Sequence, residues 1–252
     1  AFWLFIGAEY VIPVSKNVKN AKRNVPLGMM IGLGLICIVQ SILVFGFHNY
    51  VPWAELADSP APHLLYGMNL LGTFGKIWMT LVAAFAVIST QTVNALASIC
   101  QGMAKMNMMP QVFAKTNRRG VPYVGVVFVS VMIFVFSALS NNSSDAISFL
   151  ILVGSVFWMI SYILAHMDVL ILRKRFPKAP RSFKVPLGPV IPMIGILGTI
   201  YMILNISTDT AERNAIWLVT GGTFLLLGIY AFFWIKYKMK MPVFKSIPME
   251  KV

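Results

Sequence analysis

Acidic residues are scarce in this chain, which carries eight aspartates and glutamates against 21 lysines and arginines. Charged residues make up 12% of its 252 residues, whereas soluble domains average about 25%. The hydrophobic share is 58% and the mean hydropathy is +0.77, so an ordinary soluble domain is excluded. The net charge of +13 does not indicate a nucleic-acid-binding protein, because the basic residues lie in short loops between apolar blocks and not along one face.

Cysteine is almost absent, and the two that occur, Cys37 and Cys100, lie inside apolar segments. We interpret them as free thiols that pack like small apolar side chains, not as a disulfide framework. The sequence also lacks a P-loop, a G-x-S-x-G motif and any metal-binding spacing of histidines and cysteines. We therefore expect no enzyme, no cofactor and no bound metal.

The chain begins with alanine, and no signal peptide with a basic leader precedes its first apolar segment. That segment, residues 1–13, is too short to cross a bilayer alone as a regular helix. We expect the chain to be a fragment of a longer protein, beginning near the start of a membrane span.

Apolar residues are present in blocks of roughly twenty, the length that crosses about 30 Å of hydrocarbon. The sequence therefore predicts an all-α polytopic membrane protein, in which residues 1–13 form an incomplete span and six full spans follow. The full spans are Pro26–Phe47, Gly75–Gly102, Pro122–Leu139, Ala146–Leu172, Val190–Ile206 and Ala215–Trp234. The long loop 49–67 contains Pro, Trp and His residues that favour a short interfacial helix.

The charges of the loops alternate along the chain. All but two of the 21 basic residues lie before the first full span, after the second, after the fourth or in the tail, and the two exceptions are Lys76 and Arg213. The remaining loops hold Glu55, Asp58, Asp145, Asp209 and Glu212. The positive-inside rule places the basic loops in the cytoplasm.

The first apolar segment contains three unusual residues, Gly7, Glu9 and Pro13. A charged group inside a bilayer costs about 2.5–3.5 kcal/mol, so it usually faces a cavity and has a function. Glycine allows the backbone to unwind, which is tolerated at membrane depth where the backbone lines a cavity. A simple glycine kink with Glu9 reaching the cytoplasmic interface explains the same residues equally well.

Two segments resemble a known family. The stretch FWLFIGAEYVIPVSKNVKNAKRNVPLG, from Phe2 to Gly28, resembles the sixth span and basic loop of the amino acid–polyamine–organocation (APC) superfamily. The stretch MNMMPQVFAKTNRRGVP, residues 106–122, resembles the loop that follows the eighth span of that superfamily. The resemblance covers nearly the whole chain, as spans six to twelve.

The resemblance implies the second inverted repeat of a LeuT-like fold plus two peripheral helices. Residues 1–172 would hold the partial sixth span and spans seven to ten, and residues 173–188 a basic cytoplasmic linker. Residues 189–237 would hold the two peripheral spans, and residues 238–252 a basic cytoplasmic tail. Spans one to five, with half of the substrate site, would lie in a missing N-terminal half, so this chain alone should not transport.

The resemblance also implies roles for individual residues. It places a gating aromatic at Trp3, substrate-contacting backbone at Ile6, Gly7 and Ala8, and a proton-sensing acid at Glu9. Further substrate contacts in the eighth and tenth spans would be Ser89, Thr92, Asn94, Gly154, Ser155 and Trp158. For the serines, the threonine and the asparagine, helix–helix packing by small polar side chains is an equally good interpretation.

We therefore expect a secondary transporter that moves amino acids or related amines across the plasma membrane of a bacterial-type cell by alternating access. Proton-coupled symport and exchange both stay open. A pore or channel, or a non-transporting membrane subunit, is the alternative. Polar residues that line several spans would indicate a pore, whereas here they concentrate near Gly7 and in the eighth span.

The predicted topology can be tested with single cysteines placed at Lys178 and at Ser59. Lys178 follows the fourth full span on the basic side, and Ser59 lies in the long loop on the opposite side. A membrane-impermeant maleimide should label the two positions from opposite sides of sealed vesicles. Labelling of both from the same side would contradict the six-span topology.

Overall fold

The structure is a computed structural model that describes residues 7–12, 15, 18–59, 61–89, 92–141, 143–178 and 187–243. Within these residues the chain forms helices and turns and no strand, as the sequence predicts. The chain divides into two compact units. Unit 1 comprises Ala1–Ile99 with Val126–Ser130, and unit 2 comprises Cys100–Gly125 with Val131–Val252.

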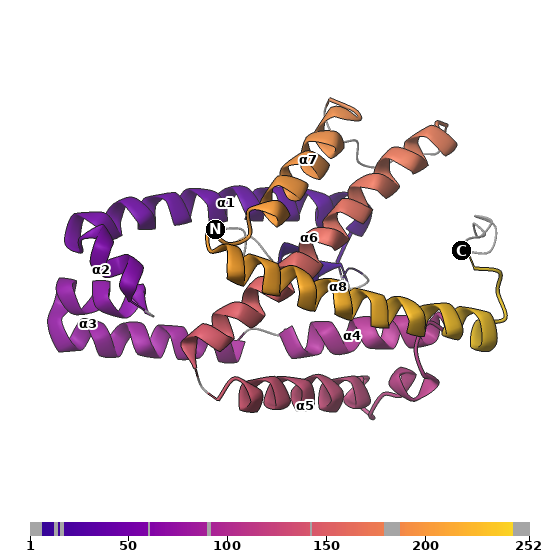
Figure 1. The fold of residues 1–252 in the computed structure, drawn as a ribbon, viewed down its shortest axis with the longest axis horizontal. Helices are drawn as coiled ribbons and strands as arrows, with labels where there is room; N and C mark the ends of the chain where they lie inside the picture. The colour runs from indigo at the N-terminus through magenta and orange to yellow at the C-terminus, as the bar shows by residue number, and fades with distance from the viewer. Residues whose placement is uncertain are drawn as a thin grey trace. The chain divides into compact units, whose positions relative to one another are not determined.

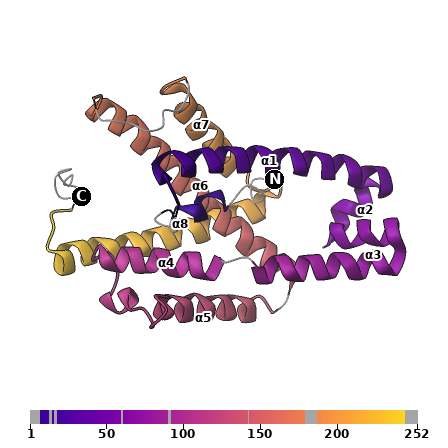
Figure 2. The ribbon, with the colours of Figure 1, turned by 180° about the vertical axis from the view of Figure 1, so that it is seen from behind.

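Unit 1 is built around two long helices, α1 (Ala21–Tyr50) and α3 (Pro62–Ser89), which the short helix α2 (Trp53–Asp58) connects (Figure 1). The connected ends pack through aromatic rings, because the Tyr66 ring lies 4.5 Å from that of Phe47 and 5.7 Å from that of Tyr50. α2 lies within the loop where the sequence predicts a short helix. The reverse view shows α1 and α3 meeting at this end (Figure 2).

Helix α3 contains a sharp reversal that the sequence analysis missed. Leu71 and Gly72 are not helical, and Gly72 has φ +61° and ψ −146°, a conformation open to glycine. Gly67 and Gly75 would lie about 12 Å apart along a straight helix. Here a Cβ built on Gly75 would overlap the carbonyl group of Gly67, so the chain folds back and packs glycine against glycine.

The second predicted span, Gly75–Gly102, corresponds to the part of α3 after this reversal and to α4 (Thr92–Lys105). α3 therefore begins at Pro62, well before the predicted start at Gly75. The turns between Pro62 and Leu71 form the part of the helix that precedes the reversal. Residues 90 and 91, between the two helices, lie outside the described residues.

Unit 2 contains the end of α4, the 3-10 turn η4 (Gln111–Ala114), most of α5 (Tyr123–Leu139), α6 (Ser144–Arg175), α7 (Val190–Leu204) and α8 (Thr210–Phe233). α8 continues as a π-helical segment, η5 (Trp234–Met239). α6 packs against α7 and also against α8, and Figure 1 shows α6 and α7 side by side.

The contact between α6 and α7 depends on small residues. A Cβ built on Gly195 would overlap the imidazole ring of His166, so the ring fills the space that the glycine leaves open. One turn along α7, the buried Thr199 hydroxyl donates to the Gly195 carbonyl at 2.6 Å. Close approach at small residues is typical of helix pairs in membranes, where lipid removes the usual hydrophobic advantage of packing.

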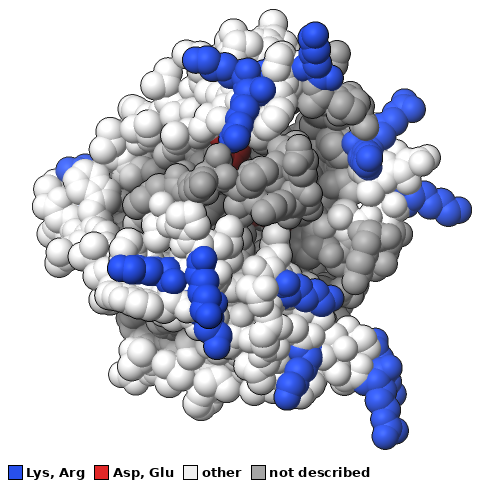
Figure 3. All heavy atoms as spheres, turned by 90° about the vertical axis from the view of Figure 1, so that its right-hand side faces the viewer, with Lys and Arg blue, Asp and Glu red and all other residues white. Residues whose placement is uncertain are grey.

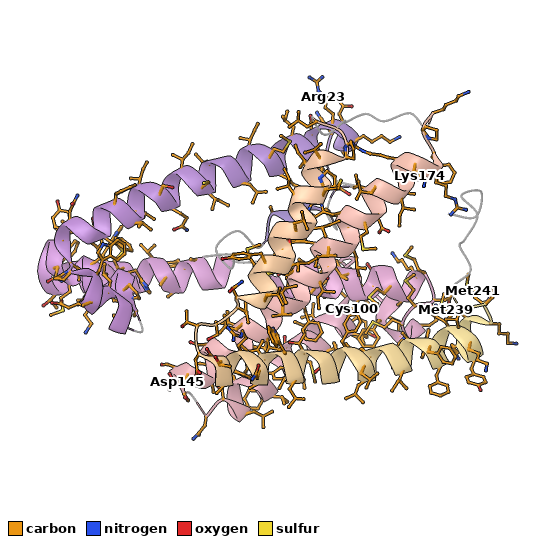
Figure 4. All side chains as sticks on the ribbon, turned by 45° about the horizontal axis from the view of Figure 1, so that its top comes forward. Arg23, Cys100, Asp145, Lys174, Met239 and Met241 are labelled. Carbon is orange, nitrogen blue, oxygen red and sulfur yellow. The ribbon has the colours of Figure 1, made fainter. Side chains whose placement is uncertain are left out.

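Opposite charges lie at opposite ends of α6. Asp145 is in its first turn and Arg173–Arg175 form its last, and Figure 4 shows Asp145 and Lys174 at the two ends. Both placements are favourable for the helix dipole. Figure 3 shows lysine and arginine side chains extending from a surface that is otherwise almost uncharged.

Four stretches of described helix are long and apolar enough to cross a membrane: Ala21–Phe47, Pro62–Ala86, Ser144–Arg175 and Thr210–Met239. α5 and α7 correspond to two further predicted spans but have 17 and 15 residues, fewer than the roughly 20 expected of a span. α7 ends at Leu204, two residues before the predicted end, where the Asn205 carboxamide donates to the Tyr201 carbonyl at 2.9 Å.

The glycine contact in α3 predicts that Gly75→Ala destabilises the protein. The added methyl would meet backbone atoms of Gly67, which cannot rotate away, so we expect a cost of about 1–3 kcal/mol. The melting temperature in detergent should fall by roughly 2–10 °C. Gly32→Ala is the matched control, because a Cβ at Gly32 has no other atom within 4 Å. Equal melting temperatures for the two variants would contradict the reversal.

Candidate functional site

Gly7 begins the first described segment of the chain and has φ +120° and ψ −15°. Residues that carry a Cβ atom rarely adopt this backbone conformation, so the position favours glycine. The 3-10 turn η2 (Ala8–Val11) follows, in which the Tyr10 N–H donates to the Gly7 carbonyl at 3.1 Å. The described residues between Gly7 and α1 form tight turns and no α-helix. η2 packs against α1 within unit 1.

Glu9 folds back toward this backbone. Its Oε2 atom accepts a hydrogen bond from the Gly7 N–H at 3.1 Å, and the residue is half-buried. A hydrogen bond to a charged acceptor is roughly twice as strong as one between neutral groups. The bond directs the carboxylate toward the glycine. One acidic side chain therefore supports the backbone N–H of the residue whose φ is positive.

The polar stretch STQTVNA of the predicted eighth span lies where α3 ends and α4 begins. Ser89 is the last residue of α3 and Thr92 the first of α4, and their side chains are outside the described part of the chain. Asn94 is exposed, and its carbonyl accepts from the Ser98 hydroxyl at 2.8 Å. No hydrogen bond of its carboxamide is described.

The candidates on α6 separate into two faces. Gly154 and Trp158 are four residues apart and share one face. A Cβ built on Gly154 would have no other atom within 4 Å, so open space lies beside it. Ser155 is buried, like Met159 four residues later, and its hydroxyl donates to the Ile151 carbonyl at 2.8 Å. The burial of Ser155 is compatible with the packing interpretation, and Gly154, Ser155 and Trp158 stay candidates for substrate contact.

The structure brings together three of the predicted site residues, Gly7, Ala8 and Glu9, in one turn of unit 1. Trp3 and Ile6 lie outside the described residues. Gly154, Ser155 and Trp158 belong to unit 2.

Sequence reasoning missed the organisation of the loop between α4 and α5. The Gln111 carboxamide donates to the Ala104 carbonyl at 2.7 Å, and the Asn117 Oδ1 atom accepts from the N–H groups of Arg119 and Val121 at 2.9 and 3.0 Å. Gly120 completes this turn at φ +78°. The motif FAKTNRRGVP thus places an asparagine and a glycine where a tight turn needs them.

The same loop bonds to the far end of the chain. The Trp234 indole N–H donates to the Asn107 carbonyl at 2.8 Å, across 127 residues of sequence. Both residues belong to unit 2, so the basic end of α4 and the basic end of α8 lie at the same end of that unit. This agrees with the predicted topology, although no spacing in the sequence indicates the pair.

Comparison with known proteins decides the family. A family model described as amino acid permease matches residues 1–234. This chain belongs to the amino acid permease family. Its membership confirms the resemblance to the APC superfamily, and with the apolar helices it identifies an integral, multi-pass membrane protein of a transporter family and not an enzyme family.

Several proteins named as permeases, antiporters or transporters are similar to this chain. It is 28% identical over 87% of its length to the branched-chain amino acid permease BcaP of Bacillus subtilis, covering 47% of that protein. It is 27% identical over 91% of its length to a putative arginine/ornithine antiporter of the same organism, covering 49%. The putrescine transporter PotE of Haemophilus influenzae is 27% identical over 94% of the chain, which covers 54% of PotE. The chain thus spans about half the length of these relatives.

The geometry at Gly7 predicts that Gly7→Val abolishes substrate binding by the intact protein while expression stays near normal. A Cβ would lie 3.6 Å from Tyr10 Cδ2, an ordinary contact, so lack of space is not the obstacle. The obstacle is the backbone angle, which costs a branched residue about 1–3 kcal/mol. Binding of radiolabelled amino acids measures the loss. Gly34→Val, in open surroundings on α1, is the control that should still bind. If Gly7→Val binds as well as this control, Gly7 serves only as a kink.

Proposed function

We propose that this chain is part of a secondary transporter that moves amino acids or related amines across the plasma membrane by alternating access. The observation that carries the proposal is the positive-φ break at Gly7 with the Glu9 carboxylate bonded back to it, in a chain of the amino acid permease family. Relatives named for branched-chain amino acids and for putrescine support this substrate range.

The break supplies groups that recognise an amino acid. Unwound backbone in a membrane leaves N–H and carbonyl groups without helical partners, and transporters place such groups at the substrate. In this proposal the backbone of Ile6, Gly7 and Ala8 contacts the substrate and Trp3 closes over it. Asn94, with Ser89 and Thr92, contributes from the eighth span, and Gly154 with Trp158 from the tenth. Spans one to five, in an N-terminal half, complete the site.

On this proposal residues 1–172 form the partial sixth span and the rest of the second inverted repeat. The linker 173–188 then leads to two peripheral spans in 189–237 and to a basic tail in 238–252. The close packing of α6 with α7 and α8 supports the idea that the peripheral spans attach to the repeat through its last helix.

Glu9 couples transport to protons. Its ionised carboxylate accepts the Gly7 N–H, and protonation weakens this acceptor. Proton uptake therefore loosens the bond that supports the broken backbone, and release restores it. The transporter changes between its outward-facing and inward-facing states as this hydrogen bond weakens or forms again.

Counterflow in liposomes tests the proposed function. Vesicles loaded with an unlabelled amino acid should accumulate labelled amino acid transiently when they contain the intact protein. The flux of a transporter saturates and depends on substrate trapped inside, because each cycle returns the site to the other side. A pore gives a flux that neither saturates nor requires trapped substrate, and that result would contradict the proposal.

The role of Glu9 predicts that Glu9→Gln flattens the pH dependence of transport. Glutamine keeps a carbonyl oxygen that can accept the Gly7 N–H but does not titrate in this range, so substrate binding at a favourable pH should be largely kept. Initial uptake rates measured across a pH series give the result. Glu55→Gln, on the short helix α2, is the matched control and should keep the parent profile. If Glu9→Gln also keeps it, Glu9 is a structural carboxylate.

A further inference from the structure

The end of α8 joins the end of α4 in a way that the transport proposal does not use. After Phe233 the helix widens into the π-helical segment η5, which is marked by Met239 in Figure 4. The Trp234–Asn107 hydrogen bond attaches this segment to the turn that follows α4. Two residues before Asn107, Lys105 ends α4. We define the junction as Lys105–Met108 together with Trp234–Lys240.

The charge of the junction is entirely positive. η5 and its end contribute Lys236, Lys238 and Lys240, and α4 contributes Lys105. The sequence has no aspartate or glutamate from residue 213 to residue 249, nor from residue 59 to residue 144. No carboxylate of either segment is therefore available to neutralise these four ammonium groups.

The same junction exposes apolar and aromatic surface. The Tyr237 side chain is 64% exposed and that of Met106 59%, and Phe233, the residue just before the junction, is 52% exposed. The Tyr237 ring stacks on Phe233 with centroids 5.9 Å apart, and the Lys236 ammonium lies 5.5 Å from the Tyr237 ring centroid. Aromatic rings beside lysines at the end of an apolar helix are typical of the membrane–water interface.

We propose that this junction is a binding site for an anionic phospholipid of the cytoplasmic leaflet. The lysine ammonium groups hold the phosphate, and the acyl chains lie along the exposed apolar surface of α8 and the methionines after α4. A free phosphate would use the charge alone, and an acidic protein segment would not use the exposed rings at membrane depth. The Trp234–Asn107 bond makes the site by holding basic residues of two segments together.

Native mass spectrometry of the full chain in detergent, with phosphatidylglycerol as the probe and phosphatidylcholine as the reference, tests the site. Each lysine near an anionic headgroup contributes about fivefold in affinity, so Lys236→Gln/Lys238→Gln/Lys240→Gln should weaken phosphatidylglycerol binding by roughly 100-fold. Phosphatidylcholine binding should not change. The triple arginine variant at the same positions keeps the charge and should retain the affinity.

The matched control removes three positive charges elsewhere in unit 2. Lys174→Gln/Arg175→Gln/Lys178→Gln, at the end of α6, should weaken phosphatidylglycerol binding less than about threefold if the junction is the site. An equal loss in this control would show diffuse attraction to the basic surface and overturn the proposal. Equal affinity of the parent chain for both lipids would also overturn it, as would displacement of phosphatidylglycerol by millimolar inorganic phosphate.

Discussion

The constraint on which the structure depends is that hydrocarbon offers no hydrogen bonds to a protein backbone. Most of the chain meets this constraint with helices, whose N–H and carbonyl groups pair internally. At three places outside the regular helices or at their ends, side chains of the same region supply hydrogen-bond partners. Glu9 accepts the Gly7 N–H, Asn205 donates to the last turn of α7, and Asn117 accepts two N–H groups in the loop after α4. The reversal at Leu71 and Gly72 is different, because there the backbone of Gly67 packs against Gly75.

The sequence predicted the helices that long apolar runs determine. The limits of α5 agree with the prediction within one residue and those of α6 within three, because polar or basic residues bound both runs sharply. It did not predict the reversal in α3, because Gly67, Gly72 and Gly75 lie within an apolar stretch that reads like an ordinary span. What decides the reversal is the packing of backbone on backbone, and a hydropathy pattern carries no information about such contacts.

In the candidate site, too, the sequence indicates some residues, whereas only the structure shows their contacts. Glu9 was visible in the sequence because a carboxylate is costly in an apolar segment, and Gly7 because it allows the backbone to unwind beside it. The structure adds the hydrogen bond that joins them. Ser155 was selected by residue type and by resemblance, and only the structure shows its hydroxyl bonded within its own helix. No contact of the described residues tests the proposed substrate-binding roles of Ala8, Asn94 and Gly154, so these roles stay predictions.

The bond between Trp234 and Asn107 has a consequence for the order of synthesis. A ribosome adds about 5–20 residues per second, so the indole arrives roughly 6–25 s after the carbonyl to which it donates, 127 residues earlier in the chain. Throughout that interval the Asn107 carbonyl, in the turn after α4, lacks the Trp234 indole N–H as its hydrogen-bond donor. The segment η5 that follows α8 therefore joins a loop that is synthesised much earlier, and a chain cut before Trp234 lacks the donor of this hydrogen bond.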